Sequence, residues 1–121
     1  MKPEPAPALS LPQSSSIAKV QALDTTLKLY AKSLNFLKPV NPGHEIFNCP
    51  TMAFLITNQT SGKQVLFDAG ARKDYWNYSP LTAGRFEKGV NVKGFKVDKG
   101  VDEVLTEANV DIDALESVVW R

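Results

Sequence analysis

One histidine and one cysteine, His44 and Cys49, are the only imidazole and the only thiol in this 121-residue chain. Both groups can bind metals, but a catalytic zinc site needs three protein ligands around an open position. A site made from His44, Cys49 and Asp68 would require a proline-rich loop and a strand end to converge. We therefore expect no metal site built from this chain alone, and the residues assign no catalytic group.

Each of these two side chains has a simpler interpretation. His44 has no visible orienting partner, so a solvated loop histidine is favoured over a ligand, a base or a residue that lines a pocket. Cys49 stands between Asn48 and Pro50, without a basic neighbour or helix start that would activate its thiol. It is favoured as a small buried apolar residue.

Asp68 is the carboxylate whose position is most informative. It ends an apolar run and stands immediately before Ala69 and Gly70. A carboxylate there could hold backbone N–H groups, or it could hold a neighbouring metal-binding loop in place. Aspartate also forms turns at strand ends by accepting hydrogen bonds from the residues that follow. We expect Asp68 and Gly70 to have a structural or supporting role, and both interpretations of Asp68 remain open.

An aromatic stretch follows, with Tyr75, Trp76 and Tyr78. These side chains could line the mouth of a substrate pocket. Aromatic residues after a strand more often pack against a neighbouring element, and packing is the favoured interpretation.

The composition is that of an ordinary globular chain, with 43% hydrophobic and 22% charged residues. Its formal net charge of +1 offers no field that would attract nucleic acid or an anionic membrane. A single cysteine excludes an internal disulfide framework. The first 13 residues contain four prolines and no long apolar run, so we expect neither a signal peptide nor a membrane anchor, and a cytoplasmic location.

Two regions organise the sequence: a flexible Pro/Ser-rich tail over residues 1–16 and an incomplete domain over residues 17–121. Alternating side chains predict a strand over residues 18–24, which turns at residues 24–26 into a second strand from residue 27 that pairs with the first. Three prolines and few periodic apolar positions predict a long irregular loop over residues 35–50.

The strongest local signal is a hairpin, with apolar runs over residues 52–57 and 64–68 around a polar turn. Because both runs are nearly continuous in apolar residues, we expect this hairpin at the centre of a sheet with both faces covered. Short helices are predicted over residues 72–78 and 80–88. Asp98 is expected to cap a helix that ends near Asn109, and residues 117–120 to begin a buried strand.

The order and spacing of several segments resemble the N-terminal part of the metallo-β-lactamase superfamily, specifically its lactonase-like hydrolases, including fungal enzymes similar to N-acyl-homoserine lactonases. The resemblance covers residues 18–121. It rests on Pro42-Gly43-His44-Glu45, Asn48-Cys49-Pro50-Thr51, Phe54-Leu55-Ile56-Thr57, Leu66-Phe67-Asp68-Ala69-Gly70-Ala71-Arg72-Lys73-Asp74 and Val110-Asp111-Ile112-Asp113-Ala114-Leu115-Glu116-Ser117-Val118-Val119-Trp120.

The resemblance implies an αββα sandwich of mostly antiparallel sheet with flanking helices, of which this chain would hold the first part. In that family, the strand that matches residues 117–120 leads into a His-x-His-x-Asp-His loop that binds zinc, and an aspartate that matches Asp68 supports this loop. The loop motif is absent from these 121 residues. We therefore expect a truncated chain that lacks hydrolase activity by itself.

Two functions follow from this resemblance. The first is a zinc-dependent hydrolase of a small-molecule lactone or a related ester, thioester or amide. The second is a non-catalytic degenerate relative or small interaction protein, and the fungal relatives imply an association with a secondary-metabolite pathway. Half of a sandwich would leave apolar strand faces in water, so self-association through an exposed sheet is also expected.

Overall fold

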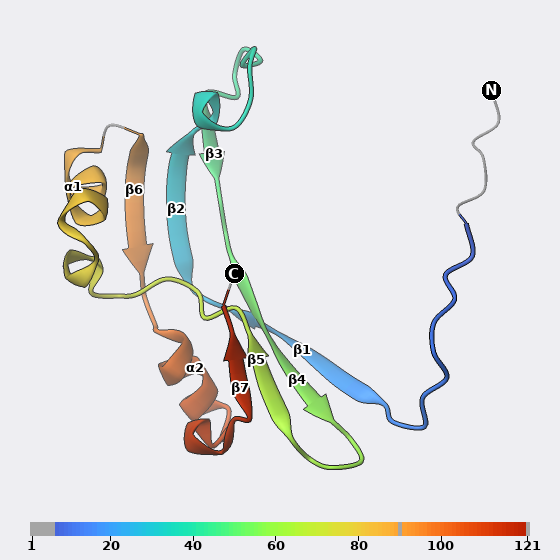
Figure 1. The fold of residues 1–121 in the computed structure, drawn as a ribbon. Helices are drawn as coiled ribbons and strands as arrows, with labels where there is room; N and C mark the ends of the chain where they lie inside the picture. Colours follow the sequence, from blue (N-terminus) through green and yellow to red (C-terminus); the bar gives the residue numbers. More distant parts are fainter. Residues whose placement is uncertain (1–6, 90, 121) are drawn as a thin grey trace.

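The computed structural model describes residues 7–89 and 91–120, which form two sheets and two α-helices in an α+β arrangement (Figure 1). The first sheet has the strand order β1–β4–β5–β7, with β1 (Ala18–Asp24), β4 (Met52–Asn58), β5 (Gln64–Phe67) and β7 (Ser117–Val119). The second has the order β3–β2–β6, with β3 (Ile46–Asn48), β2 (Leu27–Lys32) and β6 (Val92–Val97). The helices are α1 (Pro80–Lys88) and α2 (Val101–Glu107), and short 3₁₀ turns are η1 (Ser33–Asn35), η2 (Tyr75–Asn77) and η3 (Ile112–Ala114).

The predicted hairpin is the β4–β5 pair, and it occupies the centre of the first sheet. The side-chain oxygen of Asn58 accepts hydrogen bonds from the backbone N–H groups of Thr60 and Ser61 and so shapes the turn. Gly62 has φ +72°, a conformation that glycine adopts without strain. The sequence therefore located both strands and the connection between them.

Only one face of the β4–β5 hairpin is well covered. On the face toward α2, Ala53, Leu55 and Leu66 are buried together with Leu105. On the opposite face, the apolar side chains of the two central strands are only half-buried; they are Phe54, Ile56, Val65 and Phe67. The expectation that both faces are covered is therefore wrong for the second face.

β7 is a strand, as expected, but it is not a buried one. It pairs in parallel with β5, with Leu66 opposite Val118 and Phe67 opposite Val119. Val118 is 52% exposed and Val119 is 44% exposed. Among the described residues, β7 is the outer strand of the first sheet, and no further strand pairs with its free side. An apolar run predicts burial only when the covering surface is present.

The second sheet differs from the sequence-based expectation. β2 does not pair with β1, which belongs to the first sheet, and two strands that the sequence patterns missed pair with β2 instead. β3 forms inside the predicted loop of residues 35–50 and pairs with β2. β6 forms in a glycine-containing region, where it pairs with the other edge of β2 with an irregular register between Tyr30 and Ala31. Tertiary pairing with β2 forms both strands despite weak local patterns.

The predicted C-terminal helix exists as α2, but Asp98 is not its cap. The residue before the helix is Gly100, whose backbone N–H donates to Glu103 Oε2 at 2.7 Å. The carboxylate of Asp98 instead forms ion pairs with Lys28 of β2 and Lys96 of β6. Asp98 therefore joins two neighbouring strands at the end of the second sheet.

These two lysines give the stability of the protein a defined pH dependence. Hydrogen bonds from Lys28, and then from Lys96, lower the pKa of Asp98 from 3.8 to about 2. Because the folded-state pKa is depressed, the stabilisation is present above pH 3.8 and is lost as the pH falls through about 2. We expect Asp98→Asn to reduce the loss of unfolding free energy between pH 3.8 and 2, measured by urea unfolding at several pH values. An unchanged pH profile in this variant would contradict the assignment.

The described part of the predicted tail, residues 7–16, has no regular element and is exposed. Residues 1–6 lie outside the described part of the chain, so the tail as a whole stays a prediction. No helix in the described part is long and apolar enough to cross a membrane. The α+β class agrees with the sequence-based expectation, and the complete αββα sandwich stays a prediction.

Candidate functional site around the Asp68 turn

Two parallel strands, β5 and β7, bring separate parts of the chain together where both strands end. β5 ends at Phe67 and β7 ends at Val119, and these two residues lie opposite each other. The backbone N–H of Asp68 donates to the carbonyl oxygen of Val119 at 2.8 Å. The turn that follows β5 therefore lies directly beside the end of β7.

The Asp68 side chain shapes this turn. Asp68 has φ +66°, in the left-handed region that few side chains other than those of Asn and Asp adopt readily. Its Oδ1 atom accepts a hydrogen bond from the backbone N–H of Gly70 at 3.0 Å. The structure therefore contains the turn-forming hydrogen bond from the residue that follows. A role for Asp68 in supporting a metal-binding loop stays a prediction.

Gly70 fits tightly against two other elements. It has φ +64°, and a Cβ atom there would stand 3.0 Å from Thr25 Cβ and 3.1 Å from Val101 Cγ2. Thr25 is itself buried, and its Oγ1 donates to the carbonyl oxygen of Thr51 at 2.9 Å. Residues 68–70 are thereby held between the β1–β2 connection and the start of α2.

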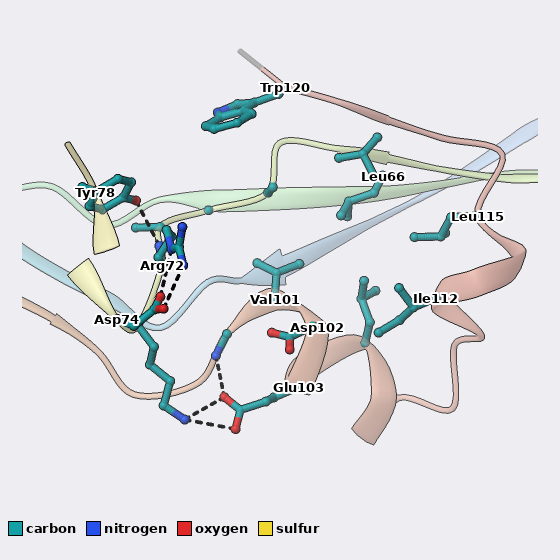
Figure 2. Close-up of a pocket in the computed structure, with 17 residues that line it drawn as sticks. Leu66, Arg72, Asp74, Tyr78, Val101, Asp102, Glu103, Ile112, Leu115 and Trp120 are labelled. Atoms are coloured by element: carbon teal, nitrogen blue, oxygen red, sulfur yellow. Dashed lines mark hydrogen bonds and ion pairs between the residues drawn. The ribbon is translucent and has the colours of Figure 1, made fainter. Parts of the chain in front are cut away.

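A groove of about 610 Å³ lies beside this turn (Figure 2). Its apolar lining comes from the sheet, α2 and the segment before β7, and Figure 2 shows Trp120 at its border. The apolar lining residues are Leu66, Ala69, Ala71, Val101, Leu105, Ile112, Leu115, Val118 and Trp120. A groove of this size and composition is in the range of small-molecule sites.

The charged side chains around the groove are largely paired with one another. Arg72 donates to both carboxylate oxygens of Asp74, at 2.9 and 2.8 Å, and this guanidinium holds the pKa of Asp74 well below its usual range. Lys73 from the loop contacts Glu103 of α2 at 2.8 Å, which lowers the pKa of Glu103. The hydroxyl oxygen of Tyr78 accepts from the backbone N–H of Arg72 at 3.1 Å. The Lys73–Glu103 pair joins the loop of residues 71–74 to α2, and the other two contacts lie within residues 72–78.

His44 and Cys49 lie outside this groove and outside a smaller polar one beside β2. His44 is exposed in the loop before β3, where its backbone N–H donates to Asn41. Figure 1 shows this loop at the end of β2 that is remote from β1. Cys49 is half-buried between β3 and β4, and its backbone N–H donates to Leu29.

Tyr75 and Trp76 also lie outside both grooves. Tyr75 meets the rings of Phe86 and Phe95 edge-on, with centroid distances of 6.1 and 5.8 Å. Trp76 meets Tyr75 edge-on and is 63% exposed. Tyr75 therefore helps to pack α1 on β6, and a pocket-lining role for His44, Tyr75 or Trp76 stays a prediction.

The residues present do not fit a metal centre. Within residues 7–89 and 91–120, no group of three or more His, Cys, Asp or Glu side chains comes together. The structure thus does not assemble His44, Cys49 and Asp68 into a site. We derive no chemical step through a metal held by these residues.

Sequence patterns missed most of the groove. The pairs Arg72–Asp74 and Lys73–Glu103 frame it, and neither was expected. The first pair could have been suspected from its spacing, since the two residues are separated by one position. The second joins residues 30 positions apart, and no local pattern reveals such a contact.

Curated relatives match almost the whole chain. It is 29% identical over 121 residues to "Gamma-lactamase FDB1" of Fusarium pseudograminearum, a match that covers 94% of this chain and 28% of that protein. It is 28% identical over 119 residues to "Metallo-hydrolase mfmC" of Annulohypoxylon moriforme, covering 98% and 31%. These matches support a partial relationship of the chain to metallo-β-lactamase-like proteins. The two names support a hydrolase-like family, and the name of the second relative describes that protein as a metallo-hydrolase.

The chain spans less than a third of the length of these two relatives. A further match is "Cytochrome P450 monooxygenase mpaDE" of Penicillium brevicompactum, at 29% identity over 94% of this chain and 13% of that protein. No family model and no solved structure matches the chain.

Proposed function

We propose that this chain forms the N-terminal part of a metal-dependent hydrolase that opens a small-molecule lactone or cleaves a related ester, thioester or amide. The observation that carries the proposal is the hydrogen bond between Asp68 N–H and Val119 carbonyl oxygen, which joins the Asp68 turn to the end of β7. The names of the gamma-lactamase and metallo-hydrolase relatives agree with hydrolysis. The proposed substrate is a small molecule, and the proposed compartment is the cytoplasm.

In this proposal, the chain contributes scaffold rather than ligands. The half-buried face of β4 and β5 would be covered by the facing sheet of an αββα sandwich, to which residues outside these 121 positions would contribute. This sheet would bury Phe54, Ile56 and Phe67. The Asp68 turn would support a zinc-binding segment beside β7. Zinc would be held by residues that these 121 positions do not supply, so the chain alone would be inactive.

The first test uses the chain as it stands. After loading with zinc and gel filtration, we expect no stoichiometric zinc by elemental mass spectrometry. We also expect hydrolysis of lactone, thioester and β-lactam reporters no faster than in buffer. His44→Ala is the matched variant: stoichiometric zinc, or turnover, that disappears in this variant would contradict the proposal.

A second arm tests the hydrolase itself. A chimera carries residues 1–121 in place of the matched segment of metallo-hydrolase mfmC, and its near-ultraviolet circular dichroism establishes folding. We expect it to retain metal and to hydrolyse at least one reporter. Asp68→Asn keeps the turn conformation and the hydrogen-bond acceptor, while Asp68→Ala removes both. Loss of hydrolysis in both variants would indicate that activity needs the negative charge of Asp68. Loss of hydrolysis only in Asp68→Ala would indicate that activity needs the turn. A folded chimera without hydrolysis would contradict the proposal.

A non-catalytic interaction protein is the second candidate. The half-buried apolar face of β4 and β5 favours it, because such faces often bind partners. Co-expression with a true partner should then raise solubility and yield a stoichiometric complex in a pull-down. Failure to find a complex, together with an active chimera, would favour the hydrolase.

A further inference from the structure

β1 is the free edge of the four-stranded sheet. Within the described ranges 7–89 and 91–120, it pairs with β4 on one side and with no strand on the other. Its seven residues form one of the two longest strands, and six of them are exposed. Edge strands of this length offer unpaired backbone groups to a further strand.

The backbone groups that face this open side can be assigned. The carbonyl oxygen of Ile17 accepts from the N–H of Gln59, beyond the last residue of β4, so Ile17 turns its backbone groups toward β4. In an antiparallel ladder, successive residues alternate between the two neighbours. Lys19, Gln21 and Leu23 therefore face β4 as well. The residues whose N–H and carbonyl groups face the open side are Ala18, Val20, Ala22 and Asp24.

We propose that β1 pairs antiparallel with β1 of a second copy of this chain, across a two-fold axis at Gln21. This register places Ala18 opposite Asp24 and Val20 opposite Ala22, so that all four outward-facing residues find partners. A shift of the axis by one residue, to position 20 or 22, leaves at least one of these residues unpaired. The inference is independent of the proposed function, because it uses only the edge of the sheet.

The side chains are compatible with this pairing. Lys19 and Asp24 are the only charged residues of β1, so each strand carries no net charge. In the proposed register, Lys19 lies opposite Leu23 and no two like charges face each other, which would be destabilising. Val20, which is 59% exposed, would pack beside Ala22 of the second copy. A second copy therefore fits this edge in both backbone and side-chain terms.

The register is tested by a disulfide. Gln21 faces its own copy across the axis as a non-hydrogen-bonded pair, for which Cα atoms are about 4.5 Å apart. This distance lies within the range that disulfides require. In a Cys49→Ser background, Gln21→Cys should therefore form a covalent dimer under mild oxidation. Lys19→Cys is the matched control, because it is equally exposed on the same strand but about 14 Å from its own copy.

We expect at least about tenfold more covalent dimer from Gln21→Cys than from Lys19→Cys, measured by non-reducing electrophoresis. Equal yields from the two variants would indicate unspecific aggregation and would overturn the register. No dimer from either variant would overturn the proposal as well.

A second measurement removes one outward-facing N–H. Ala22→Pro deletes a donor that the β4 ladder does not use, so the fold should persist. Ala22→Val keeps the N–H and is its control. Sedimentation velocity should show that Ala22→Pro raises the dissociation constant at least about tenfold, while Ala22→Val leaves it unchanged. Equal association of both variants would overturn the proposal. A third variant, Val119→Lys, places a charge on the face of the sheet and not on the β1 edge. Loss of association only in this third variant would also overturn the proposal. If Ala22→Pro does not fold, the disulfide yields still decide.

Discussion

Leu105→Ala is expected to lower the free energy of unfolding by about 2–5 kcal/mol, the range for large-to-small changes in a packed core. Leu105 is 1% exposed and joins α2 to the sheet through Ala53, Leu55 and Leu66. Removing its side chain leaves a cavity where α2 covers the first sheet. Urea unfolding followed by circular dichroism measures the loss.

Leu81→Ala is the control for this variant. Leu81 also lies on a helix, but it is 69% exposed, so its truncation should change the unfolding free energy by less than about 0.5 kcal/mol. Similar losses in the two variants would show that Leu105 does not form the centre of a rigid core.

Gly70→Ala is expected to destabilise the protein by about 2–5 kcal/mol, from two costs that act together. A Cβ atom in the left-handed region costs about 1–2 kcal/mol. The same atom would stand 3.0 Å from two atoms of Thr25, a crowding that typically costs about 1–3 kcal/mol. Thr25 cannot move aside freely, because its hydroxyl is bonded to Thr51. Thermal and urea unfolding measure the loss.

Gly84→Ala provides a control with the opposite sign. Gly84 lies inside α1, and nothing stands within 4 Å of the position that its Cβ would occupy. Alanine there should stabilise the helix by roughly 0.5–1 kcal/mol. If both glycine variants had the same small effect, the tight fit of the Asp68 turn would be refuted.

Local sequence patterns predicted several elements whose signals are local, although the helix expected over residues 72–78 is only the 3₁₀ turn η2. The β4–β5 hairpin has two apolar runs and a polar turn, and α2 has its apolar positions at helical spacing. β3 and β6 were missed because they are strands through pairing with β2 and not through their own composition. Asp98 was assigned to a helix cap because the patterns do not contain its ion-pair partner Lys28, 70 positions away.

The candidate site was predictable only in part. Asp68 and Gly70 stood out because a carboxylate and a glycine follow an apolar strand, and the structure places both in a tight turn. The groove beside this turn depends on Glu103 of α2 and on Trp120, which follows β7 where β7 pairs in parallel with β5. Contacts of this range arise from topology, which short motifs do not encode.

The parallel pairing of β5 with β7 also orders the events of folding. The β4–β5 hairpin has a short turn and can form within about 1–10 μs. β7 can join β5 only after the whole segment of residues 68–116 has closed into a loop, and this closure costs chain entropy before any pairing repays it. Nascent chains would therefore carry a preformed hairpin for some time before its outer strand docks, and during this interval the edge of β5 is open to encounters with other molecules.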